Sequence, residues 1–471
     1  MMRFCSWHAK YCVPVLAAVL MCACTNRLPY REAGLEQRAG AEQFQARSAN
    51  DTSLADLVHA AGYEGQWPPS QWNLETLTLL GLYFNPDVDV ARAQVLASQA
   101  ALATAARRSP LSLELAAEHH SREVDDTPWT LGFAVGLPIG EGSRREARVQ
   151  KATAMADAAE VEIAASMWRV RGSVRDAVID LIASTRRADL LQQRLQTHSE
   201  LVQLLQRRVD AGMASARELG RERTSLDTVK AQLALEQSTQ ANAYGDLARA
   251  LGLPLDTVRS LNIADDAIKP PGPPESADQA RANALRNRLD IYVNLLEFGA
   301  ADAEVRLAVA NQYPVVRLTP GFMWDQGDQI WSLGGLLIPP AGAKEAVREA
   351  EARREVAARR FTALQLTAIS EVEQSREVLV ATSASVDAAR GTEASARDQY
   401  ERIRRYFEAG GGDRLQLVTA RLVLVQARQH LLDAQIATLG AAARFEDSMQ
   451  LPILSEYMKL PERPAGAAPA S

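Results

Sequence analysis

Few residues in this sequence have the types and the spacing that chemistry requires. The zinc-protease pattern H-E-x-x-H, the glycine loop that binds phosphate and the G-x-S-x-G nucleophile turn are all missing from the sequence. No histidine beyond the first 23 residues has a second metal ligand at a suitable spacing on the same helix face; these histidines are His59, His119, His120, His198 and His430. The simpler interpretation of His119 and His120 is a solvated loop edge. We therefore expect no enzyme, no metal centre and no bound cofactor.

One cysteine has a chemical role that its position predicts. Residues 1–23 have a short basic start followed by an apolar run, which is typical of a signal peptide that is removed. This segment ends in Met21-Cys22-Ala23-Cys24, which resembles a bacterial lipoprotein box with Cys24 as the acylated residue. An ordinary signal-peptide cut nearby is the alternative. Residues 24–72 would then be a lipid anchor and an N-terminal segment, without an internal disulfide.

The composition narrows the class of protein further. The chain has 471 residues, of which 23% are charged, and a mean hydropathy of -0.17, which excludes a bundle of membrane helices. Aromatic residues make up only 6% while alanine is abundant, which favours long helices over a compact β-rich enzyme. The formal net charge is -6, and losing two basic residues with the signal peptide would make it more negative. We therefore expect no nucleic-acid partner.

The sequence contains an internal repeat, which we interpret as two copies of one unit. Four short matches keep their order along the chain; they pair residues 82–88 with 285–291, 129–132 with 331–334, 207–212 with 405–410, and 253–254 with 451–452. These matches place the copies at residues 73–252 and 278–452. A proline-rich linker at 253–277 would join them, and a C-terminal tail at 453–471 would follow.

A long helix followed by a returning helix is predicted in each copy. No proline interrupts residues 142–212 or 342–410, and at about 1.5 Å per residue each stretch would be roughly 100 Å long. Along both stretches, apolar residues are spaced alternately four and three residues apart, as in a coiled-coil seam. His198 lies on the first seam, where a packed or tunnel-facing histidine is expected and not a metal ligand. Because glycine usually follows a helix end, we expect the helices to stop at two tips, Ala211-Gly212 and Ala409-Gly410-Gly411-Gly412.

Ahead of each long helix, the apolar period changes to that of a strand. Strands are expected at about 111–122, 128–138, 313–324 and 329–339, with turns at 123–127 and 325–328. Apolar side chains alternate with polar or small ones, as in a transmembrane barrel. The lipid-facing set would include Trp129, Leu131, Phe133, Phe322, Trp324 and Trp331. A hairpin buried in a soluble core would look similar, but tryptophans at the strand ends favour the membrane. Since about eight strands are needed to close a barrel, the chain must share one with other copies.

Together these features resemble the TolC-like outer-membrane efflux proteins over about residues 73–452. The resemblance is carried by Asn85-Pro86-Asp87, by Leu137-Pro138-Ile139, by the basic helix start at 143–148 and by the two glycine tips. It implies a mainly α fold with a small membrane β part, in a homotrimer that forms a twelve-stranded outer-membrane barrel and a periplasmic helical tunnel. It also implies a passive exit duct whose tips dock a periplasmic adaptor, which connects it to an inner-membrane pump.

Two finer features concern the cargo. Residues 312–314 and 324–328 resemble the family branch for cobalt, zinc and cadmium export, although the segment 339–344 is shorter than expected there. Family members often carry acidic rings on the first turns of the last returning helix, where this chain has Gln416 and Thr419. Glu218 and Asp413 are the remaining candidates for a ring of tunnel charge. Solvated helix-end charges are the alternative.

Two other classes of protein share some of these features. A lipid-anchored periplasmic adaptor also has a long coiled-coil hairpin, but normally a single one inserted into small β domains. A lipid-anchored structural coiled coil would explain the seams but not the strand pairs with their tryptophans. We therefore expect the outer-membrane duct.

Overall fold

The computed structural model describes residues 39–60, 63, 65–120, 129–264, 271–272, 274–325 and 327–452. The chain divides into two compact units, Met1–Arg47 and Ser48–Ser471. The first unit contributes α2 (Ala39–Gln45), and the second holds the other described elements. The expected signal peptide, Cys24, the turn at 123–127 and the tail at 453–471 lie outside the described residues, as do parts of the proline-rich linker.

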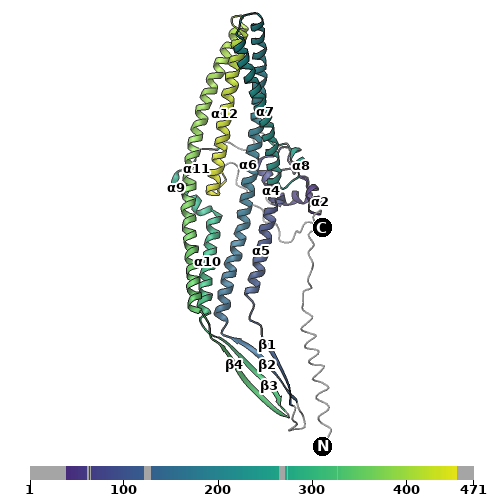
Figure 1. Cartoon of the computed structure of the whole chain (residues 1–471), viewed down its shortest axis with the longest axis vertical. Coiled ribbons are helices and arrows are strands. Elements are labelled where there is room, and N and C mark those ends of the chain that lie inside the picture. Colours follow the sequence, from purple (N-terminus) through teal and green to yellow (C-terminus); the bar gives the residue numbers. More distant parts are fainter. Residues whose placement is uncertain are drawn as a thin grey trace. The chain divides into compact units, whose positions relative to one another are not determined.

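The second unit contains the same order of elements twice (Figure 1). The first half comprises α4 (Leu74–Phe84), α5 (Pro86–Ala105), β1 (Ser112–His119), β2 (Trp129–Ile139), α6 (Gly142–Asp210) and α7 (Ala216–Leu251). The second half comprises α9 (Ala277–Asn287), α10 (Leu289–Ala310), β3 (Val315–Asp325), β4 (Asp328–Ile338), α11 (Ala343–Glu408) and α12 (Arg414–Met449). Two short helices complete the unit, α3 (Thr52–Ala60) and α8 (Leu255–Arg259). The prediction of a mainly helical fold with two strand pairs is confirmed. None of the described helices has the length and apolar character needed to cross a lipid bilayer.

The boundary between α4 and α5 shows how local sequence sets a helix start. Asn85 is the N-cap of α5, and its side-chain oxygen accepts a hydrogen bond of 2.9 Å from the Asp87 N–H. Pro86 follows in the first helical position, where a missing N–H does no harm. The Asn85 amide also donates a buried hydrogen bond of 2.9 Å to the Ala250 carbonyl near the end of α7. This short motif therefore ends one helix, begins the next and attaches both to the returning helix.

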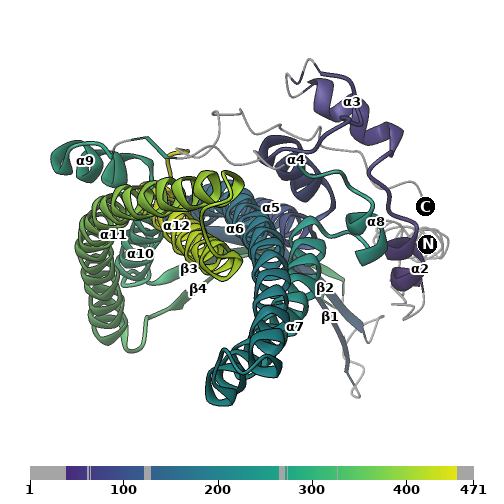
Figure 2. The ribbon, with the colours of Figure 1, turned by 90° about the horizontal axis from the view of Figure 1, so that it is seen from above.

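The long helices bury the seams that the sequence predicts. On α6, Val174, Leu181 and Leu205 are buried, and on α11 Val372 and Leu379 are buried. Seen along the long axis, α6 lies beside α7 and α11 beside α12 (Figure 2). Each fully buried aliphatic side chain contributes about 1.5–3 kcal/mol relative to an exposed one. Each long helix and its returning helix therefore form one hairpin held by an apolar seam; we call these the first hairpin (α6 and α7) and the second hairpin (α11 and α12).

The two hairpins meet along α6 and α12, where arginines of α6 contact acidic residues of α12. Arg175 lies 2.9 Å from the Glu446 carboxylate and 2.6 Å from that of Asp447. Arg171 also contacts Glu446, whose side chain is 0% exposed. Acidic residues in the last turn of a helix oppose its dipole. Glu446 and Asp447 lie in the last turn of α12, so their charges are unfavourably placed, and the Glu446 charge is also buried. The two arginines offset both costs.

Nearer the tips, the contacts between α6 and α12 are more exposed. Arg187 Nε lies 2.9 Å from Asp433 Oδ1, and Arg208 Nη2 lies 2.5 Å from Asp413 Oδ2. Exposed ion pairs typically stabilise a fold by less than about 1 kcal/mol. The strength of this polar joint therefore declines from the end of α12 towards the tips.

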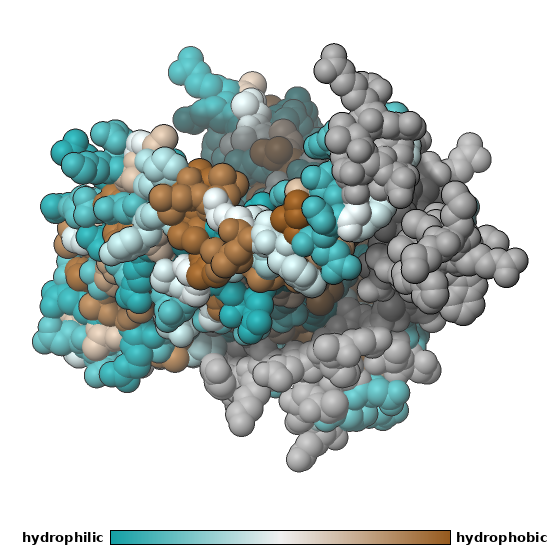
Figure 3. Space-filling model, turned by 90° about the horizontal axis from the view of Figure 1, so that it is seen from below, coloured by the Kyte–Doolittle hydropathy of each residue, from teal (hydrophilic) through white to brown (hydrophobic). Residues whose placement is uncertain are grey.

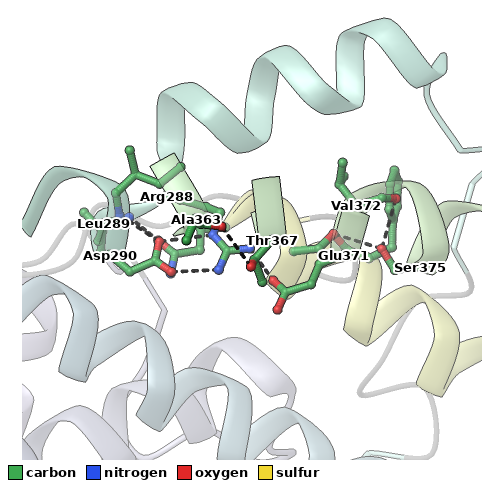
Figure 4. A network of polar contacts seen from close by, with 12 residues as sticks. Arg288, Leu289, Asp290, Ala363, Thr367, Glu371, Val372 and Ser375 are labelled. Atoms are coloured by element: carbon green, nitrogen blue, oxygen red, sulfur yellow. Dashed lines mark hydrogen bonds and ion pairs between the residues drawn. The ribbon is translucent and has the colours of Figure 1, made fainter. Parts of the chain in front are cut away.

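The start of α10 is attached to α11 by a second polar network (Figure 4). Arg288, just before α10, pairs with Asp290 at 2.7 Å and with Glu371 of α11 at 2.5 Å. One turn further along α11, the Ser375 hydroxyl lies 3.0 Å from that of Ser448 at the end of α12. These contacts fix the place on α11 where α12 ends and α10 begins.

We predict that the buried ion cluster is a large stabilising contact. Glu446→Gln leaves Arg171 and Arg175 without their shared buried counter-charge and should lower the free energy of unfolding by about 3–5 kcal/mol. Asp433→Asn, at the exposed Arg187 pair, is the matched control and should cost less than about 1 kcal/mol. Denaturant unfolding followed by circular dichroism would measure both. Equal losses in the two variants would contradict the assignment.

Candidate functional site

All four strands form one antiparallel sheet in the order β1-β2-β3-β4. The two halves join through β2 and β3, where Leu131 lies opposite Trp324 and Phe133 opposite Phe322. Among the residues that the structure describes, no strand pairs with the outer edge of β1 or of β4. An open edge presents unpaired N–H and C=O groups to another strand. Both edges of this sheet can therefore pair with strands of other chains.

One face of the sheet is apolar and exposed. The register also places Phe322 opposite Trp331, and residues directly opposite each other share a face. Leu131 is 49% and Trp331 79% exposed in the isolated chain. Seen from the strand end, apolar residues gather in patches on the surface (Figure 3). This face carries the residues expected to face lipid, which are Trp129, Leu131, Phe133, Phe322, Trp324 and Trp331.

The opposite face carries mainly small and polar side chains, with Met323, Ile330 and Leu336 among the large apolar exceptions. Gly132, Ala134 and Gly136 alternate with the apolar residues of β2. At the loop end, the Thr130 hydroxyl donates to the Asp325 carboxylate at 2.5 Å, and the His120 ring nitrogen lies 3.0 Å from the same hydroxyl. This face is suited to contact with water, which is the arrangement of a strand with lipid on one side and a solvated interior on the other.

The neighbouring histidines His119 and His120 divide between the two faces. The His119 ring packs against Trp129, with ring centroids 4.7 Å apart, while His120 faces Thr130. The expectation of a solvated loop edge did not foresee these separate partners. The cause is the two-residue period of the strand, which sends consecutive side chains to opposite sides.

Both tips are tight turns with a glycine in the left-handed region. Ala211 and Ala409 are the C-caps of α6 and α11, and the glycines that follow have φ of 69° at Gly212 and 82° at Gly410. An L-amino acid with a side chain pays roughly 1–2 kcal/mol to adopt this conformation. A Cβ at either glycine would meet nothing within 4 Å. These two positions therefore favour glycine because of their left-handed backbone conformation, and not because a side chain would clash with neighbouring atoms.

The two tips differ in the side chains beside them. A Cβ at Gly411 would lie 2.6 Å from the Tyr406 ring, and one at Gly412 would lie 3.0 Å from it. The Tyr406 ring therefore packs directly against the glycine backbone of the second tip. The first tip instead exposes Met213, which is 72% accessible.

The acidic candidates Glu218 and Asp413 lie at the starts of the returning helices. Asp413 is the N-cap of α12; one oxygen accepts from the Leu415 N–H at 3.1 Å, and the other pairs with Arg208. Glu218 lies in the first turn of α7, where the helix dipole favours a carboxylate. Asp413 therefore has its charge offset by an arginine.

The described part of the chain contains no group of three or more His, Cys, Asp or Glu side chains that could hold a metal ion. His59 Nδ1 lies 2.9 Å from the Tyr63 carbonyl oxygen. His198 is buried on the first seam, and His430 is exposed on α12.

The arginines that join the hairpins were not among the residues expected from the sequence. The sequence does contain a pattern that indicates them. Arg187, Arg194 and Arg208 are separated by multiples of seven residues, so they lie along one stripe of α6. Arg194 also contacts α12, through Gln429 at 3.5 Å. A stripe of arginines beside an apolar seam indicates that a third helix packs there and offers carboxylates or amide oxygens to the arginines.

Comparison with known proteins agrees with this architecture. A family model described as outer membrane efflux protein matches residues 82–253. Nodulation protein T of Rhizobium leguminosarum bv. viciae is 25% identical over 307 residues, which are 62% of this chain and 61% of that protein. The match thus spans about three fifths of the length of this relative.

Solved structures share the fold. The outer membrane protein VceC of Vibrio cholerae superposes with a TM-score of 0.65 at 19% identity, covering 81% of this chain and 99% of that one. CusC gives a TM-score of 0.64 at 17% identity, covering 90% and 99%. The CmeC outer membrane channel of Campylobacter jejuni gives 0.64 at 15% identity, covering 90% and 93%. These family and fold relatives are channels and efflux proteins, not enzymes. Residues 82–253 thus match the outer membrane efflux protein family, and the chain shares its fold with these outer-membrane proteins.

Proposed function

We propose that three copies of this chain form a passive exit duct through the outer membrane. The observation that carries the proposal is the four-stranded sheet with one exposed apolar face and two open edges. In lipid, unpaired backbone groups cost several kcal/mol each. Since closure needs at least about eight strands, three copies supplying twelve would satisfy both edges of every sheet.

The helical part of the chain supports the same assembly. In each chain α6 and α12 contact each other, while α7 and α11 lie on the outer sides of the hairpins (Figure 2). Leu235 on α7 and Val380 on α11 remain exposed in the isolated chain. Packing α7 of one copy beside α11 of the next would cover such residues and close the helices into a tunnel across the periplasm.

The duct would work passively, with the tips docking a periplasmic adaptor that connects it to an inner-membrane pump. The open space around Gly212 and Gly410 supports this role, because a partner backbone could approach closely there. We propose small solutes as the cargo, with heavy-metal cations as the class favoured by the resemblance of residues 312–314 and 324–328. Glu218 is the stronger candidate for a ring of tunnel charge, since Asp413 is paired with Arg208.

The first test concerns the sheet. Leu131→Arg would place a charge on the lipid-facing side and should destabilise the assembly by roughly 2–4 kcal/mol near the bilayer midplane. Ala134→Ser on the opposite face is the matched control and should be mild. Gly132→Ser is a poorer control, because a Cβ there would lie 3.3 Å from the Phe322 carbonyl oxygen. Trimer yield in mild detergent, measured by light scattering, would report the effect. Equal tolerance on both faces would show that the faces are assigned wrongly, and a monomeric wild type would contradict the trimer.

The second test concerns the tips. Gly212→Glu and Gly410→Glu should leave trimer yield intact but abolish export in cells and crosslinking to the adaptor, because each adds bulk and charge to an open surface. Gly212→Asn and Gly410→Asn are the controls, since asparagine tolerates the left-handed region; they should retain docking. Normal export by the glutamate variants would contradict the docking role. Failure of all four variants to trimerise would show that these glycines serve only as helix stops.

The third test concerns anchoring at Cys24. An acyl chain adds about 0.8 kcal/mol of membrane affinity for each buried CH₂, yet the proposed barrel should hold the trimer without it. Cys24→Ser should therefore abolish metabolic lipid labelling while the trimer stays in the outer-membrane fraction. Thr25 follows the cysteine, in place of the aspartate that commonly retains lipoproteins in the inner membrane, so we expect outer-membrane sorting. Recovery of Cys24→Ser as a soluble periplasmic monomer would contradict the barrel.

A further inference from the structure

The first hairpin contains a buried imidazole with an incomplete set of partners. His198 lies on the seam of α6 and is 8% exposed. Its Nδ1 atom is buried and has no hydrogen-bond partner. Glu222 of α7 is the facing acidic group, with 3.4 Å between His198 Nδ1 and Glu222 Oε2. The imidazole therefore lies between two packed helices, at ion-pair distance from a single carboxylate.

The surroundings of His198 favour its neutral form. Burial lowers the pKa of His198 below its ordinary 6.5, and Arg194 on the same helix acts in the same direction. Glu222 on α7 raises this pKa, but by less than burial lowers it. The locally opened state therefore binds a proton more readily than the packed state. By linkage, the stability of this packing is complete above about pH 6.5 and declines as the pH falls below that value.

The second hairpin also has a buried polar residue on its seam, but that residue responds to acid only at lower pH. Glu393 is a buried seam residue of α11 that pairs with Arg397 of its own helix and with Arg428 of α12, at 3.3 Å from the latter. Hydrogen bonds from Arg397 and Arg428 lower the pKa of Glu393 below its ordinary 4.5. Its contribution to stability is therefore present above about pH 4.5 and is lost only as the pH falls through the lowered pKa.

We propose that proton uptake by His198 loosens the packing of α6 on α7 beside the Ala211-Gly212 tip, while the second hairpin keeps its packing over the same pH range. His198 lies about 18 Å before the end of α6, at about 1.5 Å per residue. Its protonation places a charge inside the seam, and Glu222, at 3.4 Å, only partly offsets the cost of burying that charge. The first tip is thereby acid-responsive and the second is not.

Hydrogen exchange measured by mass spectrometry on the full-length protein in detergent tests this proposal without requiring channel activity. Exchange at about pH 7.5 and about pH 5.5 is compared after correction for the intrinsic pH dependence of amide exchange. Peptides covering 190–225 should lose protection several-fold at the lower pH, up to the limit for one proton of about tenfold per pH unit. Peptides covering 386–430 of the second hairpin should not change.

Three variants separate the proposed proton uptake from a general loss of packing. His198→Gln removes the titratable group and should make exchange in the first hairpin independent of pH over this range. Glu222→Gln removes the carboxylate that favours the protonated ring in the packed state, so the loss of protection should still begin near pH 6.5 but should extend to lower pH and become larger, which lowers its midpoint. His430→Gln, at an exposed histidine of α12, should leave the response unchanged.

Two results would overturn the proposal. One is equal protection of the first hairpin at both pH values in the wild type. The other is an acid response that persists in His198→Gln with an unshifted midpoint in Glu222→Gln. Because these readouts concern local opening, they remain decisive even if the chain does not form a trimeric duct.

Discussion

The unpaired backbone of the two edge strands is the constraint on which the rest of the structure depends. β1 and β4 belong to one sheet, and the described chain supplies no partner for their outer edges. An exposed apolar face and open edges together are unfavourable for an isolated chain in water or in lipid. The helices follow from this sheet, because β2 leads into α6 and β4 leads into α11. The strand order is matched by the helices next to the sheet, where α5 contacts α6, α6 contacts α10 and α10 contacts α11.

The contacts between the two hairpins add ion pairs to apolar packing. One apolar core includes residues of α6, α7, α11 and α12, and arginines and carboxylates also join α6 to α12. Apolar packing excludes water and is insensitive to salt, but exposed ion pairs weaken as ionic strength rises. The exposed ion pairs between α6 and α12 should therefore be the salt-sensitive part of the contact between hairpins, and the shared apolar core the part that persists. The buried cluster around Glu446 is the exception, since solvent and salt have little access to it.

Local features of the fold could be predicted from the sequence, and distant pairings could not. The helix stops at Gly212 and Gly410 follow from glycine chemistry, and the seam follows from a strict four-three alternation. The contact between Thr130 and Asp325 joins two halves of the chain, and no local pattern marks it. The same holds for Arg175 and Glu446, because pairing across such a separation depends on the packed helices. Periodicity shows which face of an element is buried but not what covers it.

The duplication within one chain has a consequence for symmetry. A ring built from single repeats would have identical hairpins, so any change in one would occur in all. Here the two hairpins lie on one chain and have diverged: one tip exposes Met213 and the other packs Tyr406 against glycine, and the seams carry His198 in one case and Glu393 in the other. In a closed ring of such chains, unlike hairpins would alternate around the rim. In the proposed trimer, the rim would have six similar positions of two chemical kinds, so a partner made of identical subunits would encounter two classes of contact.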